Sequence, residues 1–367
     1  MIRIVWKMFK ILLLLLLLLA AGIAGFVLFA PVLGGSPDKQ SSVLIERSSN
    51  HDGDKFVNKI PTSVSTPDPV APIGVWGMIS PPPGKNPAAP LPSRQFNKAI
   101  FGDGDFVWLG HSTILLKTDG LTVMTDPVFY NASPIPFTIT PFPLQQTTTI
   151  EQLPAIDVVT ISHDHYDHLD YKAILELDAR VGRYLVPLGV KAHLQKWGVA
   201  DDKITEMDWY DKIDHQSLTF TMAPSRHFSG RSFKRATTLW GSWIIKSKSL
   251  TVYFSGDSGY FDEFRNIGER FGPFDLAFVE NGAYNLNWSQ IHMMPEESVQ
   301  AAIDLKAKVF FPIHWGKYDL SSHSWTEPVT RAKAAAMERG VALASPLIGE
   351  VFTPTSYPVS DWWLDVR

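Results

Sequence analysis

Six consecutive residues constrain this chain more than any other feature, because most of them carry side chains that bind metal ions. They are His163, Asp164, His165, Tyr166, Asp167 and His168, and they follow the apolar run 156–162, which is typical of a buried strand. Burying so many polar groups without partners is costly. In an extended turn, His163 and His165 project to one side, whereas Asp167 and His168 enter the next helix and can face a second point. The motif therefore predicts two adjacent metal sites at a strand end.

The same arrangement recurs further along the chain. His227 follows the run 217–225, Asp257 follows 250–256, and His314 follows 308–313, and each run is an apolar candidate strand. Loops at strand ends present functional groups from a rigid scaffold, and glycines beside Asp257 allow close backbone approach. A lone histidine of this kind would more often be structural. The recurrence instead favours one shared metal centre.

Composition narrows the chemistry of that centre. The chain contains no cysteine, so a metal must be held by imidazoles and carboxylates, and neither a disulfide framework nor a thiolate nucleophile is available. The net charge of −4 lacks the basic balance of nucleic-acid-binding proteins, and we expect no nucleic-acid partner. With 367 residues, 45% of them hydrophobic, the chain can form one large domain or two small ones.

The N-terminus is the strongest compositional anomaly. A short basic segment, residues 1–10, precedes an uncharged, leucine-dominated run at 11–33. About 20 apolar residues suffice to cross a bilayer as a helix, and the run continues past the small residues at which a secretory signal would be cleaved. We expect a single-pass membrane anchor, with a cleaved signal peptide or a buried core helix as the alternatives. The preceding cations favour a cytoplasmic N-terminus and an exported, extracytoplasmic catalytic domain.

The remainder divides into a linker and a folded domain. Residues 34–94 are rich in Pro, Ser and Gly and predict a linker and extended arm with little secondary structure. In the domain, residues 95–367, alternation around Asp119-Gly120 predicts a hairpin. Helices are expected near 169–179, 190–197, 262–270, 295–306 and 327–339, and further strands near 183–188, 203–209, 217–223, 237–246, 250–255, 275–280, 308–313 and 347–352. Two sheets packed face to face, with helices outside, satisfy this order.

The motifs resemble a known superfamily. "SHDHYDHLD", "FSGDSGY" and "PIHWG", together with His227, resemble the metallo-β-lactamase superfamily. The flanking "WLGHSTILLKTDGLTVMTDPVF" and "IHMMPEES" are similar to its branch containing the N-acyl-phosphatidylethanolamine-hydrolysing phospholipase D. The resemblance covers roughly residues 95–350. It implies an α/β fold of four layers, the αββα sandwich, with the site at one edge between the two sheets.

The resemblance also distributes the ligands between two zinc ions. It implies that His163, His165 and His227 bind the first zinc, that Asp167, His168 and His314 bind the second, and that Asp257 bridges both. Members that hydrolyse β-lactams commonly place a cysteine near the second metal. This chain has none and is similar to the members whose ligands are all His and Asp, so a β-lactamase activity is disfavoured.

Further residues receive roles from general metal-site chemistry and, for His292, from the branch resemblance. The hypothesis is that a hydroxide bridging the metals attacks phosphorus or a carbonyl, with Asp257 essential. His292 would orient substrate or protonate the leaving oxygen, although it could instead cap the following helix. The branch often carries glutamine before this histidine, whereas Ile291 intervenes here after Gln290. His111 and Asp126 are expected to orient ligand imidazoles rather than to catalyse.

The substrate is suggested by weaker features. The aromatic loop 130–146 is either an interfacial surface for acyl chains or a lid packed on the core, and the cations Arg226, Arg231, Lys234 and Arg235 either attract a phosphate or form a solvated face. The leading hypothesis is a membrane-associated zinc phosphodiesterase of phospholipase D type acting on N-acyl-phosphatidylethanolamine-like lipids. The alternatives are an ester or lactone hydrolase for small molecules and a non-catalytic metal-binding envelope protein. The branch resemblance is compatible with a homodimer.

Overall fold

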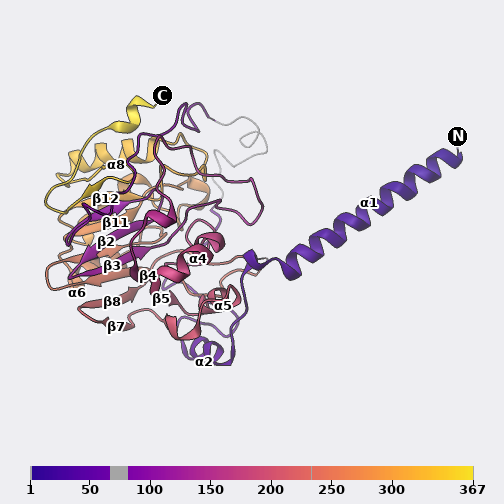
Figure 1. The fold of residues 1–367 in the computed structure, drawn as a ribbon, viewed down its shortest axis with the longest axis horizontal. Coiled ribbons are helices and arrows are strands. Elements are labelled where there is room, and N and C mark those ends of the chain that lie inside the picture. Colours follow the sequence, from indigo (N-terminus) through magenta and orange to yellow (C-terminus); the bar gives the residue numbers. More distant parts are fainter. Residues whose placement is uncertain (1, 67–81, 233, 367) are drawn as a thin grey trace.

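Two mixed β-sheets form the centre of the body, shown in the computed structural model, which describes residues 2–66, 82–232 and 234–366 (Figure 1). The first sheet has the order β13-β1-β2-β3-β4-β5-β6. Its strands are β1 (Phe106–Trp108), β2 (Ile114–Thr118), β3 (Leu121–Thr125), β4 (Ile156–Thr160), β5 (Val181–Pro187), β6 (Ile204–Met207) and β13 (Val351–Phe352). The second has the order β12-β11-β10-β9-β8-β7. Its strands are β7 (Lys212–His215), β8 (Leu218–Ala223), β9 (Ser242–Lys246), β10 (Thr251–Phe254), β11 (Leu276–Glu280) and β12 (Phe310–Ile313).

Helices cover the outer face of each sheet. On the first sheet lie α4 (Tyr171–Leu177) and α5 (Lys191–Lys196), and on the second lie α6 (Glu263–Phe271), α7 (Pro295–Asp304) and α8 (Glu327–Glu338). The alternation of strand side chains builds these layers. In β1, Phe106 and Trp108 point into the core between the sheets, whereas Val107 packs beneath the helices. The predicted αββα sandwich is therefore confirmed.

The strand directions determine where functional groups gather. In the first sheet, β1 and β3 are each antiparallel to β2, and β3 is parallel to β4. In the second sheet, β8 and β10 are each antiparallel to β9, and β10, β11 and β12 are parallel. Strands that run in the same direction end at the same edge of the sandwich. The residues that follow these strands can therefore meet at that edge. The strands concerned are β1, β3, β4, β8, β10, β11 and β12.

Some elements differ from the sequence prediction. The hairpin is confirmed, with Thr118 opposite Leu121, but the edge strand β7 was not anticipated because its short sequence is largely polar. The strand expected from 237 begins only at Ser242. The residues before it donate to other segments, since the Gly241 amide donates to the carbonyl oxygen of Ser162 at 2.9 Å and the Leu239 amide to that of Leu188 at 2.8 Å.

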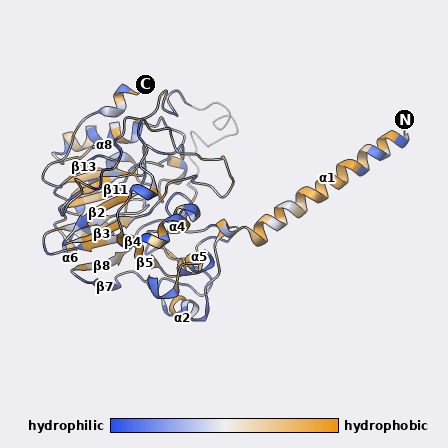
Figure 2. Cartoon of the chain, in the orientation of Figure 1, coloured by the Kyte–Doolittle hydropathy of each residue, from blue (hydrophilic) through white to orange (hydrophobic). Residues whose placement is uncertain are grey.

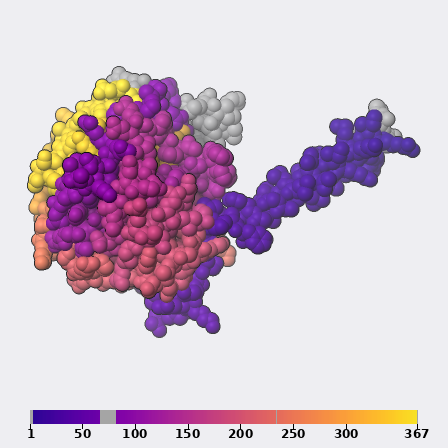
Figure 3. All heavy atoms as spheres, in the orientation of Figure 1, coloured from indigo at the N-terminus to yellow at the C-terminus, as the bar shows by residue number. Residues whose placement is uncertain are grey.

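Helix α1 (Ile2–Phe29) projects away from the body (Figures 1 and 3). Its stretch Arg3–Phe29 contains an 18-residue segment with a mean hydropathy of 3.0 and is long and apolar enough to cross a membrane (Figure 2). The helix begins before and ends earlier than the expected run 11–33. Residues Pro31–Leu33 instead form a 3-10 turn whose carbonyl oxygens bind the body, since Trp197 Nε1 donates to that of Pro31 at 2.7 Å.

The described part of the arm contains a helix that its composition concealed. Helix α2 (Lys39–Arg47) begins at Asp38, whose carboxylate accepts from the Ser41 amide, and it buries Ile45. Beyond it, the arm runs along the body, where the Phe56 amide donates to the carbonyl oxygen of Ala236 at 2.9 Å. Part of the expected arm, residues 67–81, lies outside the described residues.

Candidate metal centre

The first cluster joins one loop of each sheet. His163 and His165 follow β4, and His227 follows β8. The Nδ1 atom of His165 lies 2.9 Å from Nε2 of His163 and 3.2 Å from Nε2 of His227. With Asp257, these residues offer ligand atoms within 4.8 Å of one another, so the group can hold a metal ion.

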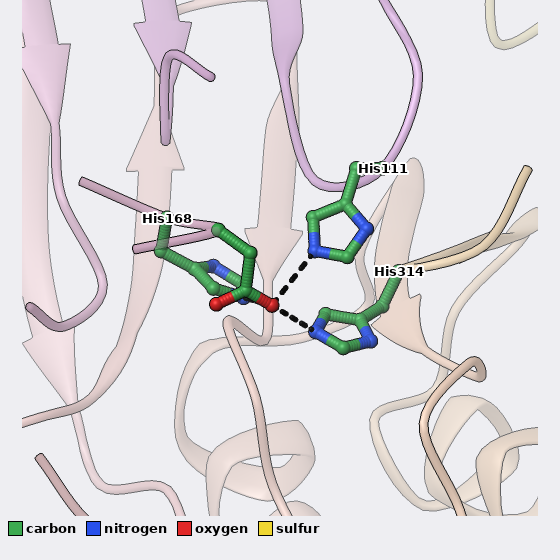
Figure 4. Close-up of side chains that lie close together, drawn as sticks. His111, His168 and His314 are labelled. Atoms are coloured by element: carbon green, nitrogen blue, oxygen red, sulfur yellow. Dashed lines mark hydrogen bonds and ion pairs between the residues drawn. The ribbon is translucent and has the colours of Figure 1, made fainter. Parts of the chain in front are cut away.

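The second cluster lies beside the first. It includes His111, which was expected to orient ligand imidazoles rather than to lie among the ligands. Its members are His111, Asp167, His168 and His314, whose ligand atoms also lie within 4.8 Å of one another. Oδ2 of Asp167 is 3.1 Å from Nε2 of His111 and 3.2 Å from Nε2 of His314 (Figure 4). The rings of His111 and His314 have centroids 4.1 Å apart. His111 therefore faces into the cluster.

Asp257 lies between the two clusters. Its carboxylate is 3.1 Å from Nε2 of His168 and 3.1 Å from Nε2 of His314, and 3.8 and 3.7 Å from those of His163 and His227. The preceding Gly256 has a φ of 56°, and a Cβ there would lie 2.5 Å from that of Ser162. Glycine thus permits the approach that carries Asp257 to the β4 loop. The structure brings together all seven sequence-predicted ligands.

Two observations show that these groups fit metal ions. Nitrogens that share a tetrahedral zinc at about 2.0–2.1 Å lie roughly 3.3 Å apart, close to the 2.9 and 3.2 Å separations around His165. In addition, Nε2 of His168, Nε2 of His314 and Oδ1 of Asp257 are buried and form no hydrogen bond of good geometry among the described residues, although both nitrogens lie within ion-pair distance of the Asp257 carboxylate. Native proteins rarely leave such atoms unsatisfied. A bound cation would satisfy all three.

Hydrogen bonds behind the clusters fix the imidazole orientations. Asp126, which follows β3, accepts from Nδ1 of His168 at 2.6 Å and from the Ser162 hydroxyl at 2.6 Å. That hydroxyl oxygen lies 2.9 Å from Nδ1 of His163. Nδ1 of His227 donates to the carbonyl oxygen of Ile291 at 2.9 Å. In each of these histidines Nδ1 is engaged, which leaves Nε2 for a metal. The parts played by Ser162 and Ile291 were not apparent from the sequence.

The electrostatics of the first cluster favour neutral imidazoles. Burial lowers the pKa of His163 and of His227 well below the usual value, and it also lowers the pKa of His165. Neutral imidazole is the form that binds metals. The first cluster is therefore in its ligating state at neutral pH.

The electrostatics of the second cluster instead favour protonated imidazoles at His168 and His314. Burial disfavours the charged forms of His168 and His314, but nearby carboxylates outweigh it. Asp257 and Asp167 raise the pKa of His168 well above its usual value and raise that of His314 to about 10. Correspondingly, the pKa of Asp257 lies well below its usual range because the adjacent imidazoles outweigh its burial. Burial lowers the pKa of His111 to about 3.

His292 reaches the same centre from the loop before α7. Its Nδ1 lies 2.9 Å from Oε1 of Glu280, the fully buried last residue of β11. Its ring lies 5.0 Å from that of His227 and 5.6 Å from that of His314. Glu280 was not identified from the sequence, although its signal was that of the ligands, a charged residue that ends an apolar strand. Gln290 turns away and accepts from the Ser63 amide.

An open cavity of about 320 Å³ lies above the clusters. Its polar lining includes His165, Asp167, Asp257, His292 and His314, and its other walls include Val64, Phe228, Trp288, Leu320 and Arg235. Arg235 thus faces the cavity, whereas Arg231 is buried and its Nη1 donates to the carbonyl oxygens of Asp164 and Leu169. The prediction that Arg231 attracts phosphate or lies on a solvated face was wrong, because it braces the ligand loop.

Two histidines outside the predicted site, His193 and His323, have structural contacts. Nε2 of the buried His193 lies 3.2 Å from the carboxylate of Asp164, and its Nδ1 accepts from the Gly35 amide. His323 contacts the carbonyl oxygen of Gly282 at 2.6 Å. Asp164 is the one acidic or histidine member of the central motif that faces away from the clusters, since it also accepts from the Gly230 amide and the Thr238 hydroxyl.

The αββα sandwich with paired His/Asp clusters at its edge defines a metal-dependent hydrolase. The chain belongs to the β-lactamase superfamily, whose domain model ("Beta-lactamase superfamily domain") matches residues 122–315. It is 42% identical to an uncharacterized protein of Mycobacterium tuberculosis, over 87% of this chain and 88% of that protein. It is 33% identical to the N-acyl-phosphatidylethanolamine-hydrolyzing phospholipase D 1 of Caenorhabditis elegans, over 62% of this chain and 68% of that protein.

Solved structures share the fold. The metallo hydrolase Igni18 of Ignicoccus hospitalis aligns with a TM-score of 0.53 at 21% identity, over 68% of this chain and 97% of that chain. At this identity the likeness concerns the fold alone.

Proposed function

We propose that this hydrolase is a two-zinc phosphodiesterase of phospholipase D type, acting on N-acyl-phosphatidylethanolamine-like lipids at a membrane. The observation that carries the proposal is the shared carboxylate of Asp257, which links two clusters at the base of an open cavity. Paired metal sites suit displacement at phosphorus, because they stabilise both the attacking and the leaving oxygen. The cavity walls that include Val64, Phe228 and Trp288 suit an apolar substrate, and the C. elegans relative is named for this lipid.

In this proposal the chain's ligands divide as the superfamily resemblance implies. His163, His165 and His227 would hold one zinc, Asp167, His168 and His314 the other, and Asp257 both. When bound, such a pair lowers the pKa of water toward 7 and neutralises charge on the transferred group. The all His/Asp donor set suits zinc.

His292 is proposed to serve the leaving group. Glu280 fixes its Nδ1, so Nε2 is the nitrogen available to the cavity. A histidine oriented in this way can protonate the oxygen of the departing head group. The products would be a phosphatidate and an N-acylethanolamine.

The proposed location is a membrane crossed by α1, with the body on the extracytoplasmic side. Helix α1 has the length and hydropathy for a span, and the cations Arg3, Lys7 and Lys10 lie at its start. Such cations remain on the cytoplasmic side.

A substrate panel tests the proposal. Full-length protein in detergent, loaded with zinc, is incubated with N-acyl-phosphatidylethanolamine, a generic phosphodiester and a set of lactones, with Asp257→Asn as the matched control. We expect release of the N-acylethanolamine by the unaltered chain only. Cleavage of lactones alone would overturn the lipid assignment in favour of a small-molecule hydrolase. Bound metal without any turnover would favour a non-catalytic protein.

A further inference from the structure

A loop between β3 and β4 presents apolar side chains to solvent. In the segment 133–139, termed the apolar loop below, Phe137 is 91% exposed, Ile135 57% and Ile139 41%. Phe137 and Ile139 also have left-handed φ angles of 64° and 46°, which side chains of this size rarely adopt. Exposed apolar residues that cluster in this way mark an interaction surface.

The apolar loop is held in place rather than free to fold back. Its ends are closed by the Ala132 amide, which donates to the carbonyl oxygen of Ile139 at 3.0 Å. Inside it, the Thr138 hydroxyl donates to that of Ser133 at 2.7 Å. On the body side, the Tyr318 hydroxyl donates to the carbonyl oxygen of Tyr130 at 2.5 Å. The longer loop 130–146 packs on the core at Phe142, which is buried. The apolar loop within it does not.

The apolar loop adjoins the end of α1. A hollow of about 470 Å³ is lined on one side by Phe26, Ala30 and Pro31, and on the other by Tyr130, Ser133 and Pro136. The exit of the helix from the body and the base of the apolar loop are therefore neighbours. Helix α8 lies on the opposite side of the body (Figure 1).

The position of this exit is fixed by buried side chains. Nε of Arg231 donates to the carbonyl oxygen of Val32 at 3.0 Å, while its Nη1 holds the ligand loop. The Gly35 amide donates to His193 at 3.0 Å. A Cβ on Gly35 would lie 2.1 Å from the carbonyl oxygen of Ala192, so the backbone at Gly35 packs directly against that of α5. A membrane around α1 would meet the body at this exit.

We propose that the apolar loop inserts into the bilayer that α1 crosses, so that the body is attached to the membrane at two points. The partner is a lipid surface, and the proposal rests on the proposed membrane location of α1. The same attachment serves the metal centre. Leu320, which lines the cavity over the clusters, packs on Val128, Ala132 and Tyr318 beneath the apolar loop. A lipid beside the loop would lie close to the entrance of the cavity.

The absence of cysteine makes a direct test clean. Phe137→Cys in the full-length chain is labelled with an environment-sensitive fluorophore and reconstituted into phosphatidylcholine–phosphatidylglycerol vesicles. The matched control is Met337→Cys on α8, a side chain that is 75% exposed. We expect blue-shifted emission, quenching by nitroxide lipids and protection from aqueous iodide at position 137 but not at 337. Equal iodide quenching at both positions, with none by nitroxide lipids, would overturn the proposal.

A second measurement separates this inference from the proposed function. Phe137→Glu is expected to lower hydrolysis of lipid in vesicles about tenfold, and to leave hydrolysis of the same lipid in detergent micelles unchanged. An equal loss in both would show that the loop acts on the site itself rather than on docking. If neither preparation hydrolyses lipid, the phospholipase assignment fails, yet the fluorescence result still decides docking. Co-flotation of the protein with vesicles does not test the loop, because insertion of α1 is enough to carry the protein with the vesicles.

Discussion

The two metal clusters are built from similar side chains but differ in the protons they hold. In the first, burial keeps His163, His165 and His227 neutral by lowering each pKa. In the second, carboxylates raise the pKa of His168 and His314. The first cluster is ready for a cation, whereas the second is internally neutralised until a cation replaces its protons. Clusters of similar ligand types thus differ in the number of protons that a cation must displace.

The cause of the difference is the position of the carboxylates. Asp167 belongs to the second cluster alone, and the Asp257 carboxylate lies nearer to His168 and His314 than to His163 and His227. Opposite charges at 3.1 Å favour the protonated imidazole despite its burial.

The largest expected effect comes from the residue common to both clusters. Asp257→Asn removes the shared negative charge and should lower turnover at least about 10³-fold, because it disrupts both metal positions. Activity together with metal content by mass spectrometry checks this, and we expect the loss of at least one metal. Asp214→Asn on the exposed edge strand β7 is the control. Near-normal turnover with full metal content would refute the ligand assignment.

The pH dependence of metal affinity should also distinguish the two clusters. Because His168 and His314 are protonated in the metal-free protein, metal binding there must release protons, and its affinity should rise with pH. For two protons the slope reaches about 100-fold per pH unit. The first cluster, with neutral imidazoles, should change little over the same neutral range. Chelator competition across pH 6–8 measures both steps, and parallel slopes for the two metals would contradict the comparison.

Asp126→Asn should act unequally on the clusters. Asp126 contacts His168 directly but reaches His163 only through the Ser162 hydroxyl. Loss of such an orienting carboxylate typically costs about 10–100-fold in metal affinity, and we expect this at the second cluster with a smaller loss at the first. Asp157→Asn, which alters a carboxylate on β4 that accepts from the Thr122 amide, is the control. Equal weakening of both metals would argue against the direct role.

The smallest effect is expected from His111→Asn. If His111 orients Asp167 rather than binding metal itself, the second metal should weaken about tenfold and the first should be unchanged. His314→Asn, which removes a proposed ligand, should abolish the second metal in the same titration. If the two variants behave alike, His111 is a ligand.

Much of this centre was predictable from local sequence because each ligand follows an apolar strand. The central motif, His227, Asp257 and His314 needed only strand ends that share an edge. The sandwich itself followed from the order of helices and strands. Each of these signals is local, because a ligand lies within a few residues of the strand that positions it.

The remaining features depend on tertiary contacts. Nothing near Ile291 indicates that its carbonyl oxygen orients His227. Arg231 was misassigned because its sequence neighbours are polar and cationic, whereas in the fold its side chain lies between the ligand loop and the residues that follow α1. Helix α2 escaped notice in a segment dominated by Pro, Ser and Gly, although Asp38, a residue type favoured before the first turn of a helix, carried a signal.

The contact between Gly35, His193 and Asp164 has a consequence for proteolytic release. One imidazole joins the residues just outside α1 to the acid between His163 and His165. A protease that freed the body by cutting before Pro31 would leave this support intact, whereas a cut after Gly35 would remove it along with the Val32 contact of Arg231. We therefore expect an active shed form to begin at or before Pro31. N-terminal sequencing of such a form, with its metal content, checks that boundary.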